Sequence, residues 1–294
     1  MIHVLLSGGL GNQLFQYATA RALAIAHSTS VVLDVRSFPF DIYGRRFALA
    51  PFSLAANMVD GDPTASARLL AFPRMRAIAW RLTTHIWPQL RYSLVGDRTF
   101  AFDSRVLEAA DGVCLRGDFQ SERYFLAIRE KLLEEFTPQQ PAAGRNAELL
   151  DEITRCRAMC VHMRLGHHDG TVAHTNSRHG TTPTAYFDRA VAEIIRDRQP
   201  ERVFVFADDP ARARGLVRFP LPTVFVDHNS GDEAHEDLRL MAACRYFVIP
   251  NSSLSWWGAW LSTASDKMVV APAQWFSGMT HDTRDLIPTS WLRR

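Results

Sequence analysis

Eight short runs of β-branched and aromatic residues recur along the chain, and helical stretches fall between many of them. Such runs predict buried strands, because a strand covered on both faces is apolar throughout. Strands that alternate with helices favour an α/β protein with parallel sheets. The predicted strands are residues 2–6, 31–35, 112–115, 159–163, 202–206, 223–226, 246–249 and 268–271, and the clearest helical stretches are residues 13–26, 186–197 and 210–217.

One segment between these runs has the composition of a linker. Residues 137–145, TPQQPAAGR, are rich in Pro, Gln, Gly and Ala and divide the chain into halves of similar size. We therefore expect two facing Rossmann-like α/β domains, residues 1–140 and 146–294, with a cleft between them. The last residues are expected to pack back on the first domain. A single doubly wound sheet is the alternative.

Composition excludes several classes of protein. A net charge of +2 over 294 residues gives no strong electrostatic attraction for nucleic acid. The four cysteines form no CxxC and lie scattered in apolar runs, which is typical of reduced core residues rather than disulfides or zinc ligands. The first residues have no pattern of a secretory leader, and no run of eighteen apolar residues occurs. We expect a cytoplasmic protein.

The segment DLRLMAACRYFVIPNSSLSWWGAWL, residues 237–261, combines a helix, a buried strand, a polar turn and a second helix. The turn is Asn251, Ser252 and Ser253. Free backbone N–H groups at a helix start, together with serine hydroxyls, make a binding site for an anion such as phosphate. The alternative is an ordinary N-cap that binds nothing. We interpret the Trp256-Trp257 pair as core packing.

The turn after the first strand is rich in glycine. Gly8 and Gly9 precede Asn12 and Gln13, where a helix opens, so the backbone can approach a ligand closely. A tight turn without a ligand explains the same glycines. The spacing is not GxGxxG, which disfavours a dinucleotide-dependent oxidoreductase.

Charged side chains follow two other predicted strands. His162 and Arg164 are two residues apart and project from the same face of a strand end, where a guanidinium matches phosphate oxygens. A core histidine and a surface arginine are the alternative. Asp209 fits the N-cap of the next helix, which leaves Asp208 for a ligand hydroxyl. Asp237 opens a helix, where it can bind a ligand or stabilise the helix dipole.

These strand ends together outline a site for a nucleotide diphosphate, because ligands of open α/β sheets bind beyond the carboxyl ends of the strands. The sequence has no compact carboxylate cluster and no DxD motif for a divalent metal. We therefore expect Arg164 and a helix N-terminus, rather than a metal, to neutralise the diphosphate.

Several of these segments also carry a resemblance that runs nearly from end to end. The chain resembles bacterial α-1,2-fucosyltransferases of glycosyltransferase family 11. The matching motifs are GGLGNQLFQYATARALA from Gly8, GDFQSERYF from Gly117, HMRLG from His162, TPTAYFDRA from Thr182, VFVFADDP from Val203, EDLRLMAACRYFVIPNSSLSWWGAWL from Glu236 and APAQWF from Ala271.

The resemblance implies a GT-B-like fold and an inverting transfer of L-fucose from GDP-β-L-fucose to a galactose-containing glycan, including a lipid-linked one, without a metal. By the same resemblance Arg164 holds the diphosphate, while His162 and Asp237 lie at the guanine. Ser252 and Ser253 would lie near the phosphates. From their positions at the strand ends, Asn251 and Asp208 are also expected to contact the donor. Gly8, Gly9, Asn12 and Gln13 would face the same cleft, and the acceptor would bind mainly to the first domain.

The chain departs from the family at one motif. Family members usually read HxRRGD, whereas Leu165 and His167 stand here at the second arginine and the aspartate, and the next acid is Asp169. His167 or Asp169 can then serve as the general base, since an imidazole titrates near neutrality. A structural role for the family aspartate, a different acceptor and loss of activity are further alternatives.

Two basic or histidine-rich segments remain open to more than one interpretation. His167, His168, His174 and His179 form either an acceptor loop or solvated polar filler, and their spacing fits no zinc pattern. The stretch from Arg68 to Tyr92 has five arginines and no acid, which favours either helices covering the first domain or contact with the inner membrane surface.

Alternatives to the fucosyltransferase are a GT-B enzyme for another GDP-sugar or acceptor, and a non-catalytic protein that binds nucleotide sugars or glycans.

Overall fold

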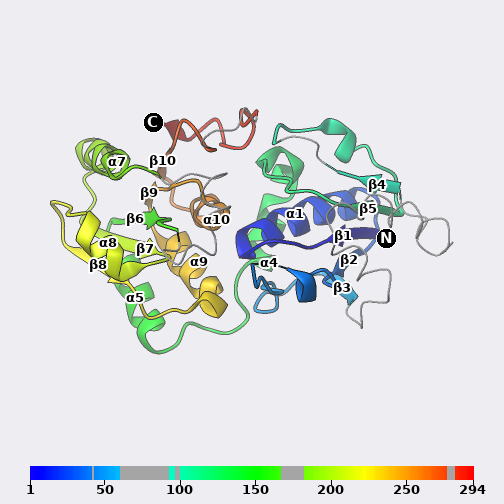
Figure 1. The fold of residues 1–294 in the computed structure, drawn as a ribbon, viewed down its shortest axis with the longest axis horizontal. Helices are drawn as coiled ribbons and strands as arrows, with labels where there is room; N and C mark the ends of the chain where they lie inside the picture. Colours follow the sequence, from blue (N-terminus) through cyan, green and yellow to red (C-terminus); the bar gives the residue numbers. More distant parts are fainter. Residues whose placement is uncertain (42, 60–92, 97–99, 167–181, 277–281) are drawn as a thin grey trace. The chain divides into compact units, whose positions relative to one another are not determined.

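A computed structural model describes residues 1–41, 43–59, 93–96, 100–166, 182–276 and 282–294. The chain divides into two compact units, Met1–Phe136 and Thr137–Arg294. Each unit is built on its own sheet, and every strand pair in both sheets is parallel (Figure 1). The predicted α/β class with two parallel sheets is confirmed, and the alternative of one doubly wound sheet is wrong.

The first unit has a five-stranded sheet in the order β3-β2-β1-β5-β4. Its strands are β1 (Ile2–Leu5), β2 (Val31–Asp34), β3 (Ala56–Val59), β4 (Ser93–Val95) and β5 (Val113–Leu115). Its helices are α1 (Leu10–Ala26) and α4 (Arg129–Glu135), with short 3-10 turns η1 (Phe38–Phe40), η3 (Ser104–Val106), η4 (Glu122–Tyr124) and η5 (Leu126–Ile128).

Helix α1 is buried along most of its length and is tied to α4 by a polar contact. The hydroxyl of Tyr17 donates to the Glu135 carboxylate at 2.6 Å, and Arg21 forms an ion pair with the same carboxylate at 2.9 Å. All three side chains are shielded from solvent, so each satisfies a charge or a polar group that burial would otherwise destabilise.

The second unit has a six-stranded sheet in the order β11-β10-β9-β6-β7-β8. Its strands are β6 (Ala158–Met163), β7 (Arg202–Ala207), β8 (Thr223–Val226), β9 (Tyr246–Val248), β10 (Met268–Ala271) and β11 (Leu292–Arg293). Its helices are α5 (Gly144–Thr154), α7 (Thr184–Arg198), α8 (Pro210–Leu216), α9 (Ala234–Ala243) and α10 (Ser253–Leu261), and η6 (Gly231–Glu233) precedes α9.

Central strand β6 sends alternate side chains to the two faces of the sheet. Met159, Val161 and Met163 join one apolar cluster with residues of α7 and α8. Because successive side chains of a strand point to opposite faces, Cys160 and His162 face the other side. The thiol of Cys244, at the end of α9, lies next to Cys160. His162 therefore lies on the sheet face that α9 covers.

The predicted strands and helices are all present, with ends shifted by up to three residues. The sequence patterns did not reveal β3, β4 or β11. Helix α5 begins at Gly144, inside the segment expected to be a linker. Helix α9 begins at Ala234, so Asp237 lies within its first turn rather than at its start. All four cysteines are free thiols, as predicted.

Substituting Ala for Gly258 is expected to destabilise the second unit. A Cβ at this position would lie 2.7 Å from the Met241 Cβ, so α9 and α10 would have to separate. Overpacking of this kind costs about 1–3 kcal/mol. Urea unfolding followed by tryptophan fluorescence measures the change. Gly215→Ala in α8 is the matched control, because nothing lies within 4 Å of its added Cβ and helix propensity predicts a gain of up to about 1 kcal/mol.

Candidate functional site

Strands β9, β6 and β7 lie side by side in the second unit, and their carboxyl ends meet at one edge of the sheet (Figure 1). Val161 pairs with Val248 on one side of β6, and Met163 pairs with Ala207 on the other. This register brings the residues that follow each strand together. They are Arg164 after β6, Asp208 after β7 and Asn251 after β9.

Arg164 links the ends of β6 and β9. It is half-buried, and its Nη1 donates to the carbonyl oxygen of Asn251 at 3.4 Å. The predicted proximity of Arg164 to the turn at Asn251 is therefore present in the structure. A guanidinium beside a helix N-terminus is suited to an anionic ligand.

Asp208 anchors the chain after Arg164. Its carboxylate accepts the backbone N–H of Leu165 at 2.8 Å and that of Gly166 at 3.0 Å. Arg212 of α8 donates to the Leu165 carbonyl at 3.0 Å. The sequence left Asp208 without a structural role, and the structure gives it one. Asp209 caps α8 by accepting from the Arg212 N–H, as predicted.

His162 is the most deeply buried of the titratable predicted site residues that the structure describes. It is 7% exposed, and burial lowers its pKa to about 4, with the charge of Arg164 lowering it further and Asp208 opposing the shift. The imidazole is therefore neutral at pH 7. Its Nδ1 has no hydrogen-bond partner in the part of the chain that the structure describes. A buried ring nitrogen of this kind is suited to bind a ligand.

Helix α10 begins directly after β9. Its N-cap is Ser252, whose hydroxyl makes no capping hydrogen bond, and its first turn carries no acidic side chain. No acidic side chain of the helix's own first turn therefore offsets the positive end of its dipole. Trp256 and Trp257 are fully buried, and the Trp256 indole N–H donates to the Leu286 carbonyl at 2.9 Å. Their predicted packing role is confirmed.

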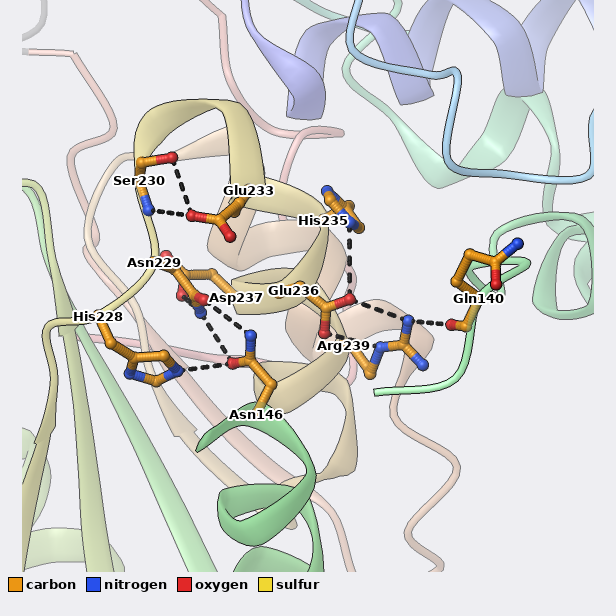
Figure 2. Close-up of polar contacts among 10 residues, drawn as sticks. All are labelled: Gln140, Asn146, His228, Asn229, Ser230, Glu233, His235, Glu236, Asp237 and Arg239. Atoms are coloured by element: carbon orange, nitrogen blue, oxygen red, sulfur yellow. Dashed lines mark hydrogen bonds and ion pairs between the residues drawn. The ribbon is translucent and has the colours of Figure 1, made fainter. Parts of the chain in front are cut away.

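Asp237 lies in a polar cluster at the start of α9, shown in Figure 2. Its Oδ1 accepts from Asn229 Nδ2 at 2.7 Å. Burial raises the pKa of Asp237 to about 6, the Asn229 hydrogen bond opposes the rise, and the charges of Glu233 and Glu236 add to it. Helix α9 follows β8, so this cluster lies at the same carboxyl edge of the sheet as Arg164.

The glycine-rich turn belongs to the first unit. Gly8 has φ +75°, and a Cβ there would lie 2.7 Å from the Asn12 Nδ2, so the position requires glycine. The Gln13 side chain donates to the carbonyls of Gly8 and Arg46 at 2.9 and 2.8 Å. Asn12 accepts from Gln120 at 3.2 Å. Gln13 therefore holds the turn together, and a donor contact by this turn stays a prediction.

His167, Asp169 and the stretch from Arg68 to Tyr92 lie outside the described residues. The described residues contain no group of three His, Cys, Asp or Glu side chains arranged to hold a metal ion. They also contain no helix long and apolar enough to cross a membrane.

Sequence reasoning missed the hydrogen-bond network around Asp237. Asn229, which follows β8, donates to Asp237. Asn229 is bonded in turn to Asn146 in the first turn of α5, and Asn146 contacts His228. Residues 223–226 were predicted as a strand. The polar residues that follow it, including His228 and Asn229, could have been assigned to the site in the same way as those after the other strands. Asn146 carried no such signal, because it follows the predicted linker, residues 137–145, rather than a predicted strand.

Comparison with known proteins identifies the family. The family model of glycosyl transferase family 11 matches residues 69–292. The chain belongs to this family. It is 30% identical to an α-1,2-colitosyltransferase of Escherichia coli, over 98% of this chain and 97% of that protein. It is also 30% identical to the O-antigen biosynthesis glycosyltransferase WbnK of Escherichia coli, over 98% of both chains. The chain is a glycosyltransferase.

Solved structures agree with the fold. Arabidopsis thaliana FUT1, a mutant in complex with GDP, superimposes with a TM-score of 0.52 at 10% identity, over 91% of this chain and 70% of that one. The α-1,6-fucosyltransferase NodZ, soaked with GDP-fucose, gives a TM-score of 0.49 at 16% identity, over 88% and 92%. The superposition on FUT1 confirms the predicted GT-B-like class.

Asp237→Asn is expected to stabilise the protein above pH 6. The folded state raises the pKa of Asp237, so the folded protein takes up a proton between pH 6 and pH 4 that the unfolded chain does not. The Asp237 carboxylate therefore destabilises the fold at neutral pH, and this effect fades as the pH falls through 6. Asparagine removes it while keeping an acceptor for Asn229. Urea midpoints should differ more at pH 7.5 than at pH 4.5.

Glu233→Gln is the control of opposite sign. Hydrogen bonds from the Ser230 N–H and hydroxyl hold the pKa of Glu233 below its ordinary value. Its carboxylate therefore stabilises the fold at neutral pH, and the glutamine variant should be less stable than wild type at pH 7.5. Equal midpoints for Asp237→Asn and wild type at both pH values would contradict the prediction for Asp237.

Proposed function

We propose that the protein is an inverting α-1,2-fucosyltransferase that moves L-fucose from GDP-β-L-fucose to a galactose-containing glycan. The observation that carries the proposal is the meeting of Arg164, the Asn251 turn and the start of α10 at one sheet edge. These groups suit a diphosphate, and membership of glycosyl transferase family 11 makes a nucleotide sugar the natural source of one.

In the proposed reaction a base removes the proton of the acceptor hydroxyl as its oxygen attacks C1 of fucose. The bond between C1 and the β-phosphate oxygen breaks on the opposite side, and its electron pair stays on GDP. Arg164 and the backbone N–H groups of the first turn of α10 stabilise the negative charge that develops on the diphosphate. We propose that this stabilisation needs no metal ion.

The remaining donor contacts are assigned by position. Asp237 accepts the N–H groups of the guanine edge, and the unpartnered Nδ1 of neutral His162 binds the nucleoside. Ser252 and Ser253 donate their hydroxyls to the phosphates. We propose His167 or Asp169 as the general base. Separate His167→Ala and Asp169→Ala variants distinguish the two, because only loss of the base removes transfer while GDP binding stays intact.

A second donor has support from one observation. The relative that is 30% identical over nearly the whole chain transfers colitose through an α-1,2 bond. GDP-colitose is therefore the alternative donor. The O-antigen relative supports a lipid-linked O-antigen precursor as the acceptor. We propose that the reaction takes place at the cytoplasmic face of the inner membrane, where the basic stretch from Arg68 to Tyr92 would contact lipid.

The deciding experiment incubates the purified protein with GDP-fucose or GDP-colitose and a panel of galactosides, followed by linkage analysis of the products. An α-1,2-fucosyl product supports the proposal. A colitosyl product alone supports the second donor. GDP binding with neither transfer nor hydrolysis would instead support a nucleotide-sugar-binding protein without activity.

Arg164→Ala is expected to lower the transfer rate by at least about a hundredfold while leaving the fold intact. The substitution removes the cation that stabilises the negative charge developing on the diphosphate of GDP. GDP release and thermal unfolding measure the two effects. Arg196→Ala is the matched control, since Arg196 is an exposed arginine of the same unit paired with Asp197 on α7. Full turnover by Arg164→Ala would exclude Arg164 from the site.

A further inference from the structure

Two asparagine side chains stand behind the Asp237 carboxylate and face each other. Asn146 Nδ2 donates to Asn229 Oδ1 at 2.8 Å, and Asn229 Nδ2 donates to Asn146 Oδ1 at 3.0 Å. Figure 2 shows this amide pair, which joins the start of α5 to the turn before α9. Each amide uses both a donor and an acceptor on the other, so neither can rotate without losing two hydrogen bonds.

The pair has a neighbour at each end. Asn229 Nδ2 also donates to Asp237 Oδ1 at 2.7 Å, and His228 Nε2 lies 2.8 Å from Asn146 Oδ1. An asparagine oxygen only accepts, so His228 carries its proton on Nε2 in this contact. The amide pair therefore accepts from the His228 N–H at one end and donates to the Asp237 carboxylate at the other.

Both asparagines of the network are at least partly shielded from solvent, and each is held by several hydrogen bonds. Asn146 is 9% exposed, and the three polar contacts that its side chain makes with described residues all belong to the network. Asn229 holds only one oxygen of Asp237, on one side. This hydrogen bond restrains the rotation of the carboxylate, which keeps acceptor capacity for a ligand. A carboxylate held in this way can accept two parallel N–H groups at once, as a guanine presents with its N1–H and exocyclic amine.

We propose that Asn229 and Asn146 are positioning residues that orient Asp237 for the guanine of the donor and so help to select guanine over other bases. This inference rests on the proposed function, in which Asp237 binds that base. The asparagines touch Asp237 and each other rather than the reacting atoms. Their effect is on affinity and base selectivity, not on the chemical step.

The hydrogen bond from Asn229 also affects the charge of Asp237. Glu233 and Glu236 raise the pKa of this carboxyl, and the Asn229 N–H lowers it. His228 is the other titratable side chain in the network. Removing the Asn229 donor should raise the pKa of Asp237 further, so that a higher pH is needed before the carboxylate can accept two N–H groups.

The test measures binding of GDP and inosine diphosphate by calorimetry between pH 5 and pH 8. Inosine diphosphate lacks the exocyclic amine and offers one N–H to Asp237. Asn229→Ala is expected to weaken GDP binding at pH 7 about tenfold, the loss of one hydrogen bond to a charged group. The GDP preference over inosine diphosphate should fall, and the pH at which GDP binding reaches half its maximum should rise.

Three further variants make the result interpretable. Asn146→Ala removes the support of Asn229 but keeps its bond to Asp237, so a smaller change in the same direction is expected, and this variant decides if Asn229→Ala does not fold. Asp237→Asn should lose most of the preference for GDP. Asn57→Ala, an exposed asparagine of β3 in the first unit, should bind as wild type does.

The outcomes separate the two proposals. Wild-type affinity, selectivity and pH dependence in Asn229→Ala, together with weaker binding in Asp237→Asn, would overturn the positioning role and leave the proposed function standing. No GDP binding by the wild-type protein would overturn both. Loss of affinity with unchanged selectivity and unchanged pH dependence would assign Asn229 a structural role only.

Discussion

The parallel pairing of β6 with β9 on one side and β7 on the other is the constraint on which the candidate site depends. Each of these strands ends at the same edge of the sheet. The residues that follow them, Arg164, Asp208 and Asn251, therefore bring a cation, a carboxylate and an amide to one place. Asp208 then fixes the chain after β6 through two backbone N–H groups. Without that anchor, Arg164 would stand at the start of an unrestrained loop rather than beside the Asn251 carbonyl.

Two ionisable groups at this edge are held away from their ordinary protonation equilibria. Burial keeps the His162 imidazole neutral and raises the pKa of Asp237 to about 6. Neither arrangement favours folding, because both groups lose solvation without gaining an ion pair within the part of the chain that the structure describes. Groups of this kind concentrate at binding sites, where a ligand supplies the missing partner. The amide pair behind Asp237 limits this destabilisation by providing one hydrogen bond.

In the first unit, contacts within the unit account for the shape of the glycine-rich turn. Gln13 and the positive φ of Gly8 shape the turn between β1 and α1 from within the unit. Gly8, which suggested a ligand, is explained by its backbone conformation and by the close approach of Asn12. Its structural role and a role of the turn in binding are compatible, since a tight turn also exposes backbone N–H groups.

The sequence by itself determined the α/β class, the positions of the eight main strands and the identity of most polar residues beyond them, because buried parallel strands are apolar throughout and end at polar turns. It could not reveal β3, β4 or β11, which are short and weakly patterned. Only the tertiary structure decided that Asp208 anchors a backbone loop, that α9 begins before Asp237 and that Asn146 meets Asn229. Those contacts join residues 43 and 83 positions apart, and no local pattern encodes such distances along the chain.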